Sequence, residues 1–345
     1  MKKLLTSILT IALVFSVSTK VNAEGETPTP EPEETTITTV NETETKTLPE
    51  VLEDGEYGSN HYIKQSAKVV LDRNYDYNGD AIYVVNNAKV TIDLKGYTLK
   101  TSILCCTGEG SELKIIDSTA SSKPVVSGYD VEYKSGKIDG PTVVKATNNG
   151  AIYLESGTIK GSLFVEGNES STKEEDAIYS SITVNGGYID GKASSIVCGN
   201  GAQLYINDGV LKVLNSPVIS GYSDDNGETT VKIKDGKFID QISDYMLNYG
   251  YIACGVYQPQ NGTLEILGGE FYVERGVGIL TRSGKTTISG NAKILVSGNY
   301  VGAVEDDSIE VPTVAVYNDL KAKYQEEHLV QKYQVVLIHM MYLNI

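Results

Sequence analysis

The chain has 345 residues, 40% of them hydrophobic, and a formal net charge of −16 at pH 7. The hydrophobic fraction is enough to build a core, and the acidic balance excludes nucleic acid as an expected partner, because phosphate backbones repel a negative surface. Four cysteines in a chain of this length exclude a scaffold stapled by disulfides, so the fold must rest on its core.

Residues 1–23 are typical of a secretory signal peptide. Lys2 and Lys3 precede an apolar run over residues 4–17, and Val21-Asn22-Ala23 offers the small residues that a signal peptidase recognises. The run is shorter than the roughly 18 residues that a spanning helix needs, so cleavage after Ala23 is favoured over a membrane anchor. We therefore expect a secreted or cell-surface protein whose mature part has no membrane span.

Residues 24–47 are rich in Thr, Glu and Pro and contain few large apolar side chains. Such a segment cannot bury enough surface to offset the entropy of ordering, which predicts a disordered linker. Two interpretations stay open. The segment is a spacer between a folded module and the cell envelope, or it is only a disordered mature N-terminus.

Five blocks of the chain share one template, with apolar residues at the first, third and eighth positions and Gly at the sixth. The alternation in the first half predicts a strand with one buried face. The fixed Gly permits a bend, after which the last apolar residue begins a second short strand on a new face. The blocks span residues 152–159, 182–189, 204–211, 231–238 and 264–271.

The blocks recur at irregular intervals, which suits a solenoid with loops of different lengths. A β-sandwich is the alternative, but it does not explain why the same corner follows the same strand each time. The first-position residues are therefore expected to stack in one ladder. That ladder would contain Ile152, Ile182, Leu204, Val231 and Leu264.

Two segments farther upstream follow a similar pattern, Val90-Thr-Ile-Asp-Leu-Lys-Gly-Tyr-Thr-Leu99 and Leu113-Lys-Ile-Ile-Asp117. They resemble the opening coils of the pectin-lyase-like superfamily, especially of surface proteins from Gram-positive gut bacteria. The resemblance covers residues 60–316 or so and implies right-handed coiling. The predicted fold is thus all-β, a right-handed single-stranded parallel β-helix over residues 48–316.

The resemblance implies little about catalysis. Lyases of the superfamily use calcium-binding acids with an Arg or Lys base, and its hydrolases use clustered Asp residues near a His and an Arg. The chain has three histidines, His61, His328 and His339, and Asp224-Asp225 lies in a segment typical of a solvated turn. We therefore predict no catalytic residues and no cofactor.

A series of alternating oxygen-bearing side chains from Asp72 to Asp80 suggests a calcium loop. The Gly and the bidentate Glu of such a loop are not at the required places, so no metal site is predicted. The series consists of Asp72, Asn74, Asp76, Asn78 and Asp80.

Three tyrosines are candidate binding residues. The template sends Tyr153 and Tyr205 outward on one sheet and Tyr188 outward on the neighbouring face. Rings two repeats apart on a flat sheet offer faces and hydroxyl groups to an extended glycan. The alternative is that tyrosine is simply a good strand former on a half-exposed surface.

The cysteines are expected to be unpaired. Cys198 and Cys254 are predicted at equivalent places two repeats apart, which is beyond the reach of a disulfide. Cys105 and Cys106 are adjacent in a strand and point to opposite faces, so one of them is expected to be exposed.

Residues 317–345 differ from the repeats in having helix composition and then an apolar end. They predict a short helix that caps the solenoid, or alternatively a truncated end. Taken together, we expect a non-catalytic adhesin-like or carbohydrate-binding module that contacts an extracellular glycan or a host surface. The alternative is a polysaccharide lyase or glycoside hydrolase.

Overall fold

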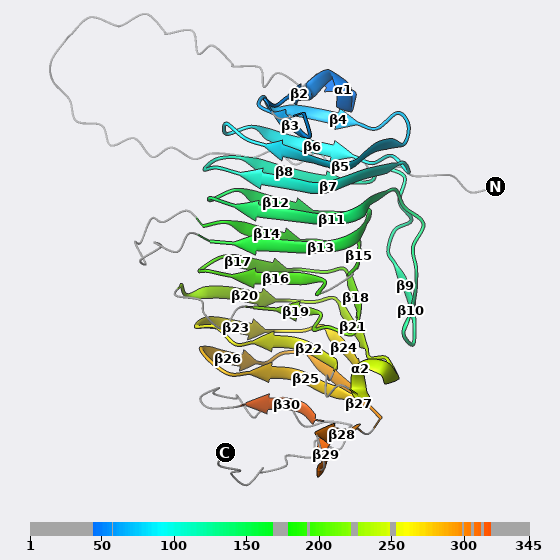
Figure 1. Ribbon diagram of the computed structural model, residues 1–345, viewed down its shortest axis with the longest axis vertical. Coiled ribbons are helices and arrows are strands. Elements are labelled where there is room, and N and C mark those ends of the chain that lie inside the picture. Colours follow the sequence, from blue (N-terminus) through cyan, green and yellow to red (C-terminus); the bar gives the residue numbers. More distant parts are fainter. Residues whose placement is uncertain are drawn as a thin grey trace, which may run out of the picture. The chain divides into compact units, whose positions relative to one another are not determined.

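The computed structural model describes residues 44–318, except residues 57, 168–178, 192–193, 222–226, 249–252, 299, 305–306 and 312–313. The predicted signal peptide, the linker up to residue 43 and the tail beyond Asn318 lie outside the described residues, as do Asp224-Asp225. The described part is all-β and is dominated by two long sheets (Figure 1). This confirms the predicted class.

The first sheet has ten strands, and every neighbouring pair in it is parallel. In spatial order its strands are β1 (Thr45–Lys46), β4 (Ala67–Val70), β6 (Lys89–Asp93), β8 (Glu112–Ile116), β12 (Ala151–Leu154), β14 (Ser181–Val184), β17 (Gln203–Ile206), β20 (Thr229–Ile233), β23 (Gly262–Ile266) and β26 (Lys285–Ile288).

The second sheet has sixteen strands and is parallel except where β2 meets β3. Its strands before the division described next are β2 (Glu53–Asp54), β3 (Asn60–Ile63), β5 (Tyr75–Val84), β7 (Thr98–Thr107), β11 (Lys137–Thr147) and β13 (Thr158–Glu166).

After β13 the second sheet divides into two rows, because each long strand is replaced by two short ones. One row contains β15 (Tyr188–Asp190), β18 (Val210–Leu214), β21 (Lys237–Gln241), β24 (Glu270–Glu274) and β27 (Lys293–Ser297). The other contains β16 (Ile196–Gly199), β19 (Ile219–Ser220), β22 (Ala253–Gln258), β25 (Gly276–Thr281) and β30 (Val314–Asn318).

The remaining elements lie outside these rows. Two antiparallel hairpins pair only within themselves. They are β9 (Val125–Ser127) with β10 (Asp130–Glu132), and β28 (Tyr300–Val304) with β29 (Asp307–Val311). The helices are α1 (Leu48–Val51) and α2 (Asp244–Asn248).

The predicted ladder is confirmed by the register of the first sheet. Ile152 pairs with Ile182, Ile182 with Leu204, Leu204 with Val231, and Val231 with Leu264. Each of these side chains is at most 1% exposed. The eighth-position residues form a second buried ladder on the other sheet, which ends with Phe238 stacked on Phe271 at 4.3 Å. Two inward faces of each repeat therefore supply one continuous core.

The repeated glycines form the corners between the two sheets. Two properties of these positions require glycine, the backbone conformation and the close approach of neighbouring backbone. Gly157, Gly187, Gly209 and Gly236 all have positive φ, between 82° and 122°, which L-residues rarely adopt. A Cβ on Gly187 would also lie 2.7 Å from the carbonyl oxygen of Gly157 in the preceding repeat. The template thus keeps Gly at this place for conformation and for close stacking of successive corners.

Strand pairing extends past both predicted bounds of the repeat region, residues 48 and 316. Thr45 and Lys46 pair with β4, and the Thr47 backbone N–H donates to the Glu50 carboxylate at 2.6 Å, so strand pairing includes residues of the predicted linker. At the other end β30 continues to Asn318, two residues into the predicted tail. Strand pairing shows this extension, whereas the composition of these residues does not.

Two predictions about the cysteines were wrong, although all four are free thiols. Ile196 pairs with Ile219 and Ile219 with Val256, so Gln258 rather than Cys254 lies in register with Cys198. Cys105 and Cys106 are both buried, at 4% and 0% exposure. Alternation does turn Cys105 outward, but neighbouring side chains cover it, and it lies 3.9 Å from the Thr147 hydroxyl.

Candidate functional site

A long connection between β8 and β11, residues 118–136, leaves the sheets and runs over the corners of later repeats; we call it the arm (Figure 1). Asp117 holds together the two ends of the arm, where it leaves and rejoins the sheets. This buried carboxylate accepts hydrogen bonds from the backbone N–H groups of Gly96, Thr119 and Gly136, which joins both ends of the arm to the corner before it. The segment from Leu113 to Asp117 thus marks the place where the arm departs.

Polar contacts hold the outer part of the arm. Lys123 Nζ lies 2.5 Å from Asp208 Oδ2, and Lys212 Nζ donates to the backbone oxygen of Tyr129 at 2.7 Å. The Tyr129 hydroxyl lies 2.7 Å from Ser297 Oγ on β27. None of residues 118–135, all of which the structure describes, is buried. The arm therefore crosses the repeats without entering their core.

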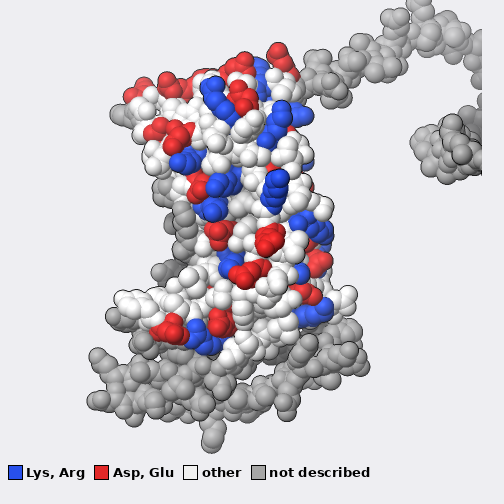
Figure 2. Space-filling model, turned by 90° about the vertical axis from the view of Figure 1, so that its right-hand side faces the viewer, with Lys and Arg blue, Asp and Glu red and all other residues white. Residues whose placement is uncertain are grey.

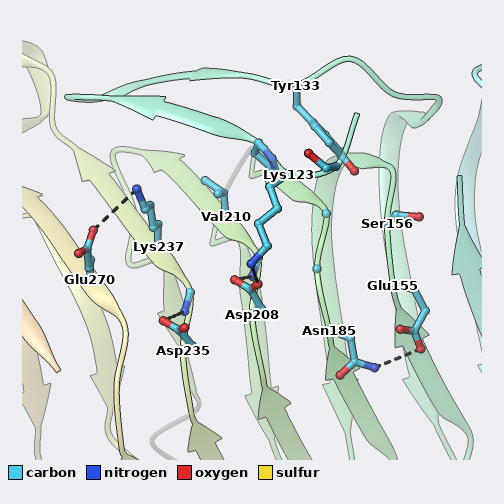
Figure 3. Close-up of a pocket in the computed structure, with 16 residues that line it drawn as sticks. Lys123, Tyr133, Glu155, Ser156, Asn185, Asp208, Val210, Asp235, Lys237 and Glu270 are labelled. Carbon is cyan, nitrogen blue, oxygen red and sulfur yellow. Dashed lines mark hydrogen bonds and ion pairs between the residues drawn. The ribbon is translucent and has the colours of Figure 1, made fainter. Parts of the chain in front are cut away.

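The arm and the corners beneath it enclose a groove with a cavity volume of 310 Å³ (Figure 3). The arm contributes Lys123 and Tyr133 to the groove, and four successive corners form its floor. Where a corner residue is glycine, no side chain covers the backbone of the floor. The lining residues are Ser122, Lys123, Pro124, Tyr133, Glu155, Ser156, Asn185, Gly186, Gly187, Asp208, Gly209, Val210, Asp235, Gly236, Lys237 and Glu270.

Amides and a carboxylate from consecutive repeats form a polar row, of which Asn185 and Glu155 line the groove. Asn207 Nδ2 donates to Asn185 Oδ1 at 2.7 Å, and Asn185 Nδ2 donates to Glu155 Oε1 at 3.1 Å. On the arm side the Gly157 N–H donates to the Tyr133 hydroxyl at 3.4 Å. Amides and carboxylates held in one row beside a tyrosine ring are groups that can hydrogen-bond and stack on sugars.

Glu270 closes one end of the groove as an ionised group. Lys293 Nζ and the Tyr272 hydroxyl each donate to it at 2.7 Å, and Lys237 Nζ lies 3.7 Å away. The hydrogen bonds from Lys293 and Tyr272 hold the pKa of Glu270 below its ordinary value. A general acid needs a pKa shifted in the opposite direction, so Glu270 is suited to binding rather than to proton donation at neutral pH.

Charged side chains of both signs surround this region. Figure 2 shows Lys and Arg interspersed with Asp and Glu on the side of the molecule that is at the right in Figure 1. The excess of acid in the whole chain is not gathered into one patch on this side.

The structure places the three predicted tyrosines outside the lining of the groove. Tyr153 and Tyr205 lie in one outward row of the first sheet with Thr183 between them, and Tyr188 begins β15 in the second sheet. All three are partly exposed, and the Tyr205 hydroxyl donates to Gln203 at 3.0 Å. Burial raises the pKa of Tyr153 and of Tyr188 above the ordinary value. Nothing in the structure brings the three together.

The series from Asp72 to Asp80 is engaged in local contacts. Asp72 accepts from the Tyr75 hydroxyl at 2.5 Å, Asn74 accepts from the Thr98 N–H at 2.8 Å, and Asp76 accepts from the Asn78 N–H at 3.1 Å. Among the described residues, no group of three His, Cys, Asp or Glu side chains is arranged to hold a metal ion.

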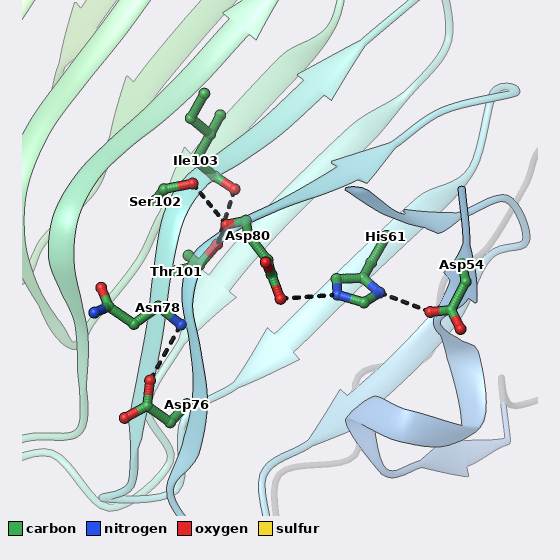
Figure 4. Close-up of polar contacts among 8 residues, drawn as sticks. All are labelled: Asp54, His61, Asp76, Asn78, Asp80, Thr101, Ser102 and Ile103. Atoms are coloured by element: carbon green, nitrogen blue, oxygen red, sulfur yellow. Dashed lines mark hydrogen bonds and ion pairs between the residues drawn. The ribbon is translucent and has the colours of Figure 1, made fainter. Parts of the chain in front are cut away.

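His61 lies between two carboxylates at the N-terminal end of the sheets (Figure 4). Its Nδ1 is 2.9 Å from Asp54 Oδ1, and its Nε2 is 3.4 Å from Asp80 Oδ2. Both ring nitrogens are therefore occupied in joining β2 to β5 across β3. His61 belongs to a different part of the fold from the groove and does not serve its chemistry.

Comparison with known proteins adds no relative, since no protein-family model, no curated protein and no solved structure matches the chain. In the part of the chain that the structure describes, no helix is both long enough and apolar enough to cross a membrane.

The sequence analysis missed the arm and the groove. The arm has no template of its own, and the groove arises only when corners from residues 155–237 stack beneath residues 122–133. One signal was present, because polar or small residues at the fourth and fifth template positions precede the corner glycine in four of the five blocks, the exception being Leu267 in the fifth. In the sequence these residues show no pattern of their own. They form a row only when strand register places successive repeats side by side.

Proposed function

We propose that the protein is a non-catalytic, secreted or cell-surface parallel β-helix protein that binds carbohydrate in the groove beneath the arm. The groove carries the proposal, since it combines a tyrosine ring, a row of amide and carboxylate groups and a bare glycine floor that lets a ligand approach closely. Its volume lies at the lower end of the range for ligand sites, which suits a short segment of a glycan chain.

Right-handed coiling is part of the proposal. Successive strands of the first sheet are parallel and are joined by crossover connections, and such connections are right-handed in nearly all proteins. The resemblance of residues 90–117 to the pectin-lyase-like superfamily supports the same hand.

Secretion is proposed from residues 1–23. Their basic start, apolar run and small residues before position 24 support export with cleavage after Ala23. N-terminal sequencing of exported protein tests this directly, and a mature chain that still begins at Met1 would refute it.

The binding experiment uses the mature chain and a panel of neutral, amino and acidic oligosaccharides, with affinity measured by calorimetry. The same samples are assayed for new reducing ends and unsaturated ends. We expect binding without either product. Loss of ring contact in Tyr133→Ala should weaken the affinity about tenfold. Steady release of either kind of end would show an enzyme and overturn the non-catalytic assignment.

A matched control separates the groove from the predicted tyrosine row. The double variant Tyr153→Ala/Tyr205→Ala removes two partly exposed rings from the first sheet and leaves the groove lining intact. It should bind as the parent protein does. If it loses binding while Tyr133→Ala keeps it, the ligand lies on the tyrosine row and the groove is not the site.

A further inference from the structure

Asp208 and Asp235 occupy the same place in consecutive repeats of the groove. Ile206 pairs with Ile233 and Val210 with Lys237, so the backbone positions of Asp208 and Asp235, which lie between these pairs, are about one strand spacing apart, ~5 Å. Each holds its own corner through one oxygen. The Gly209 N–H donates to Asp208 Oδ1 at 2.7 Å, and the Gly236 N–H donates to Asp235 Oδ1 at 2.8 Å. These bonds orient both carboxylates before any ligand arrives.

A cation from a distant part of the chain already lies against Asp208. Lys123 reaches down from the arm, and its Nζ lies 2.5 Å from Asp208 Oδ2 (Figure 3). The pKa of Lys123 is raised, first by the hydrogen bond to Asp208 and then by the charges of Asp208 and Asp235. Both aspartates therefore act on one ammonium group, which comes from outside the repeats.

The contact is one that a ligand can replace. The Lys123 side chain is 74% exposed and that of Asp208 is 35% exposed, and exposed ion pairs contribute little net stability. Lys123 also belongs to the arm, none of whose residues 118–135 is buried. Moving the Lys123 side chain away from Asp208 would therefore not expose buried apolar residues.

We propose that Asp208 and Asp235 form a subsite for a cationic amino sugar, and that Lys123 occupies this subsite until the ligand's ammonium group displaces it. The inference rests on the proposed glycan binding and names its ligand class. The ammonium group of the sugar takes the place of Lys123 Nζ, so the carboxylates still face a positive charge. Acidic sugars are disfavoured, because their carboxylates would face Asp208 and Asp235.

The test compares two probes that differ only at the amino group, a β-1,4-linked glucosamine oligomer, which is cationic, and its fully N-acetylated form, which is neutral and carries an acetyl group in addition. Affinities are measured at low and high salt for the parent protein, Lys123→Ala, Asp208→Asn and Asp235→Asn. Asparagine keeps the oxygen that accepts from the corner glycine. The control is Lys100→Ala, which removes an exposed ion pair with Asp76 on strands β7 and β5.

We expect the parent protein to prefer the amine probe and to lose that preference at high salt. Lys123→Ala should bind the amine probe about fivefold more tightly, without change for the acetylated probe. Either asparagine variant should reduce the preference, and Lys100→Ala should behave as the parent.

Two failures can be told apart. If the acetylated probe binds in the groove as well as the amine probe does, or if Lys123→Ala weakens amine binding, the cationic subsite is wrong while carbohydrate binding stands. If neither probe and no other glycan binds any form of the protein, both proposals fall.

Discussion

In the repeats, first- and third-position side chains such as Leu204 and Ile206 are fully buried in continuous ladders, whereas every residue of the arm from Ser118 to Ser135 is at least partly exposed. Both regions contain short strands with Gly turns between them. They differ in what holds them, since apolar burial holds the repeats, whereas polar contacts at Lys123, Tyr129 and Tyr133 hold the arm. The arm should therefore open without unfolding of the sheets.

The strongest test of this contrast places a charge in each region. Ile206→Asp removes a fully buried side chain and leaves a carboxylate in the core, so we expect a loss of about 3–5 kcal/mol in the free energy of unfolding. Val125→Asp changes an arm residue that is 63% exposed and should stay within about 0.5 kcal/mol of the parent. Denaturant unfolding measures both. Equal losses would mean that the arm shares the core.

Glycine substitution gives the next largest contrast. Gly187 has φ 82° and a Gly157 carbonyl oxygen 2.7 Å from its would-be Cβ, while Gly128 in the arm has φ 62° with nothing within 4 Å. Gly187→Ala must distort both backbone and packing, which should cost about 1–3 kcal/mol. Gly128→Ala strains only a local turn and should leave the melting temperature nearly unchanged. The reverse order of melting temperatures would contradict this account of the corners.

A buried acid in the repeats should make their stability depend on pH. Asp240 occupies an inward position between Val213 and Val273, is 0% exposed, and has one carboxylate oxygen without a hydrogen-bond partner among the described residues. Desolvation raises its pKa well above the ordinary value, although N–H groups of Cys254 and Gln241 donate to it. The folded protein therefore binds a proton that the unfolded chain releases.

The sign of the pH effect follows from this raised pKa. The contribution of Asp240 to stability is complete below the unfolded pKa, about 4, and is lost as the pH rises toward the folded pKa. Asp240→Asn cannot ionise, so its melting temperature relative to the parent should increase between pH 4 and pH 8, by the equivalent of about 1–3 kcal/mol. Asp76→Asn, at an exposed carboxylate, is the control. A difference that is constant with pH would show that Asp240 is ionised throughout.

The smallest expected effect concerns the tip of the arm. Tyr129→Phe removes the hydroxyl group that contacts Ser297, so amides of residues 118–136 should exchange about two- to tenfold faster while the melting temperature stays the same. Tyr205→Phe removes a comparable hydrogen bond in a repeat and should leave arm exchange unaffected. Unchanged exchange in Tyr129→Phe would show that other contacts hold the tip.

The sequence predicted the repeats well because their determinants are local. Alternation at the first and third positions identified one buried ladder, and Gly at the sixth identified the corner, since both follow from the geometry of two or three consecutive residues. Register between Cys198 and Cys254 was predicted wrongly, because loops of different lengths separate the strands and no local pattern records their offset.

The candidate site was much less predictable. Outward positions such as Tyr153 and Tyr205 could be placed on their sheet, yet the groove depends on residues 122–133 lying over corners as far away as residues 235–237. Asp208 gives no sign in the sequence that Lys123 will be its partner, because the two are 85 residues apart and joined only by the path of the arm.

The sequence by itself determined that the described chain is all-β, which residues face the core and where each repeat turns, because apolar periodicity and glycine conformation act within a single repeat. Only the tertiary structure decided the division of the second sheet after β13, the burial of Asp240 and the cover that the arm forms over the groove. These features depend on contacts between residues distant in the chain, which form only when the strands are paired in register.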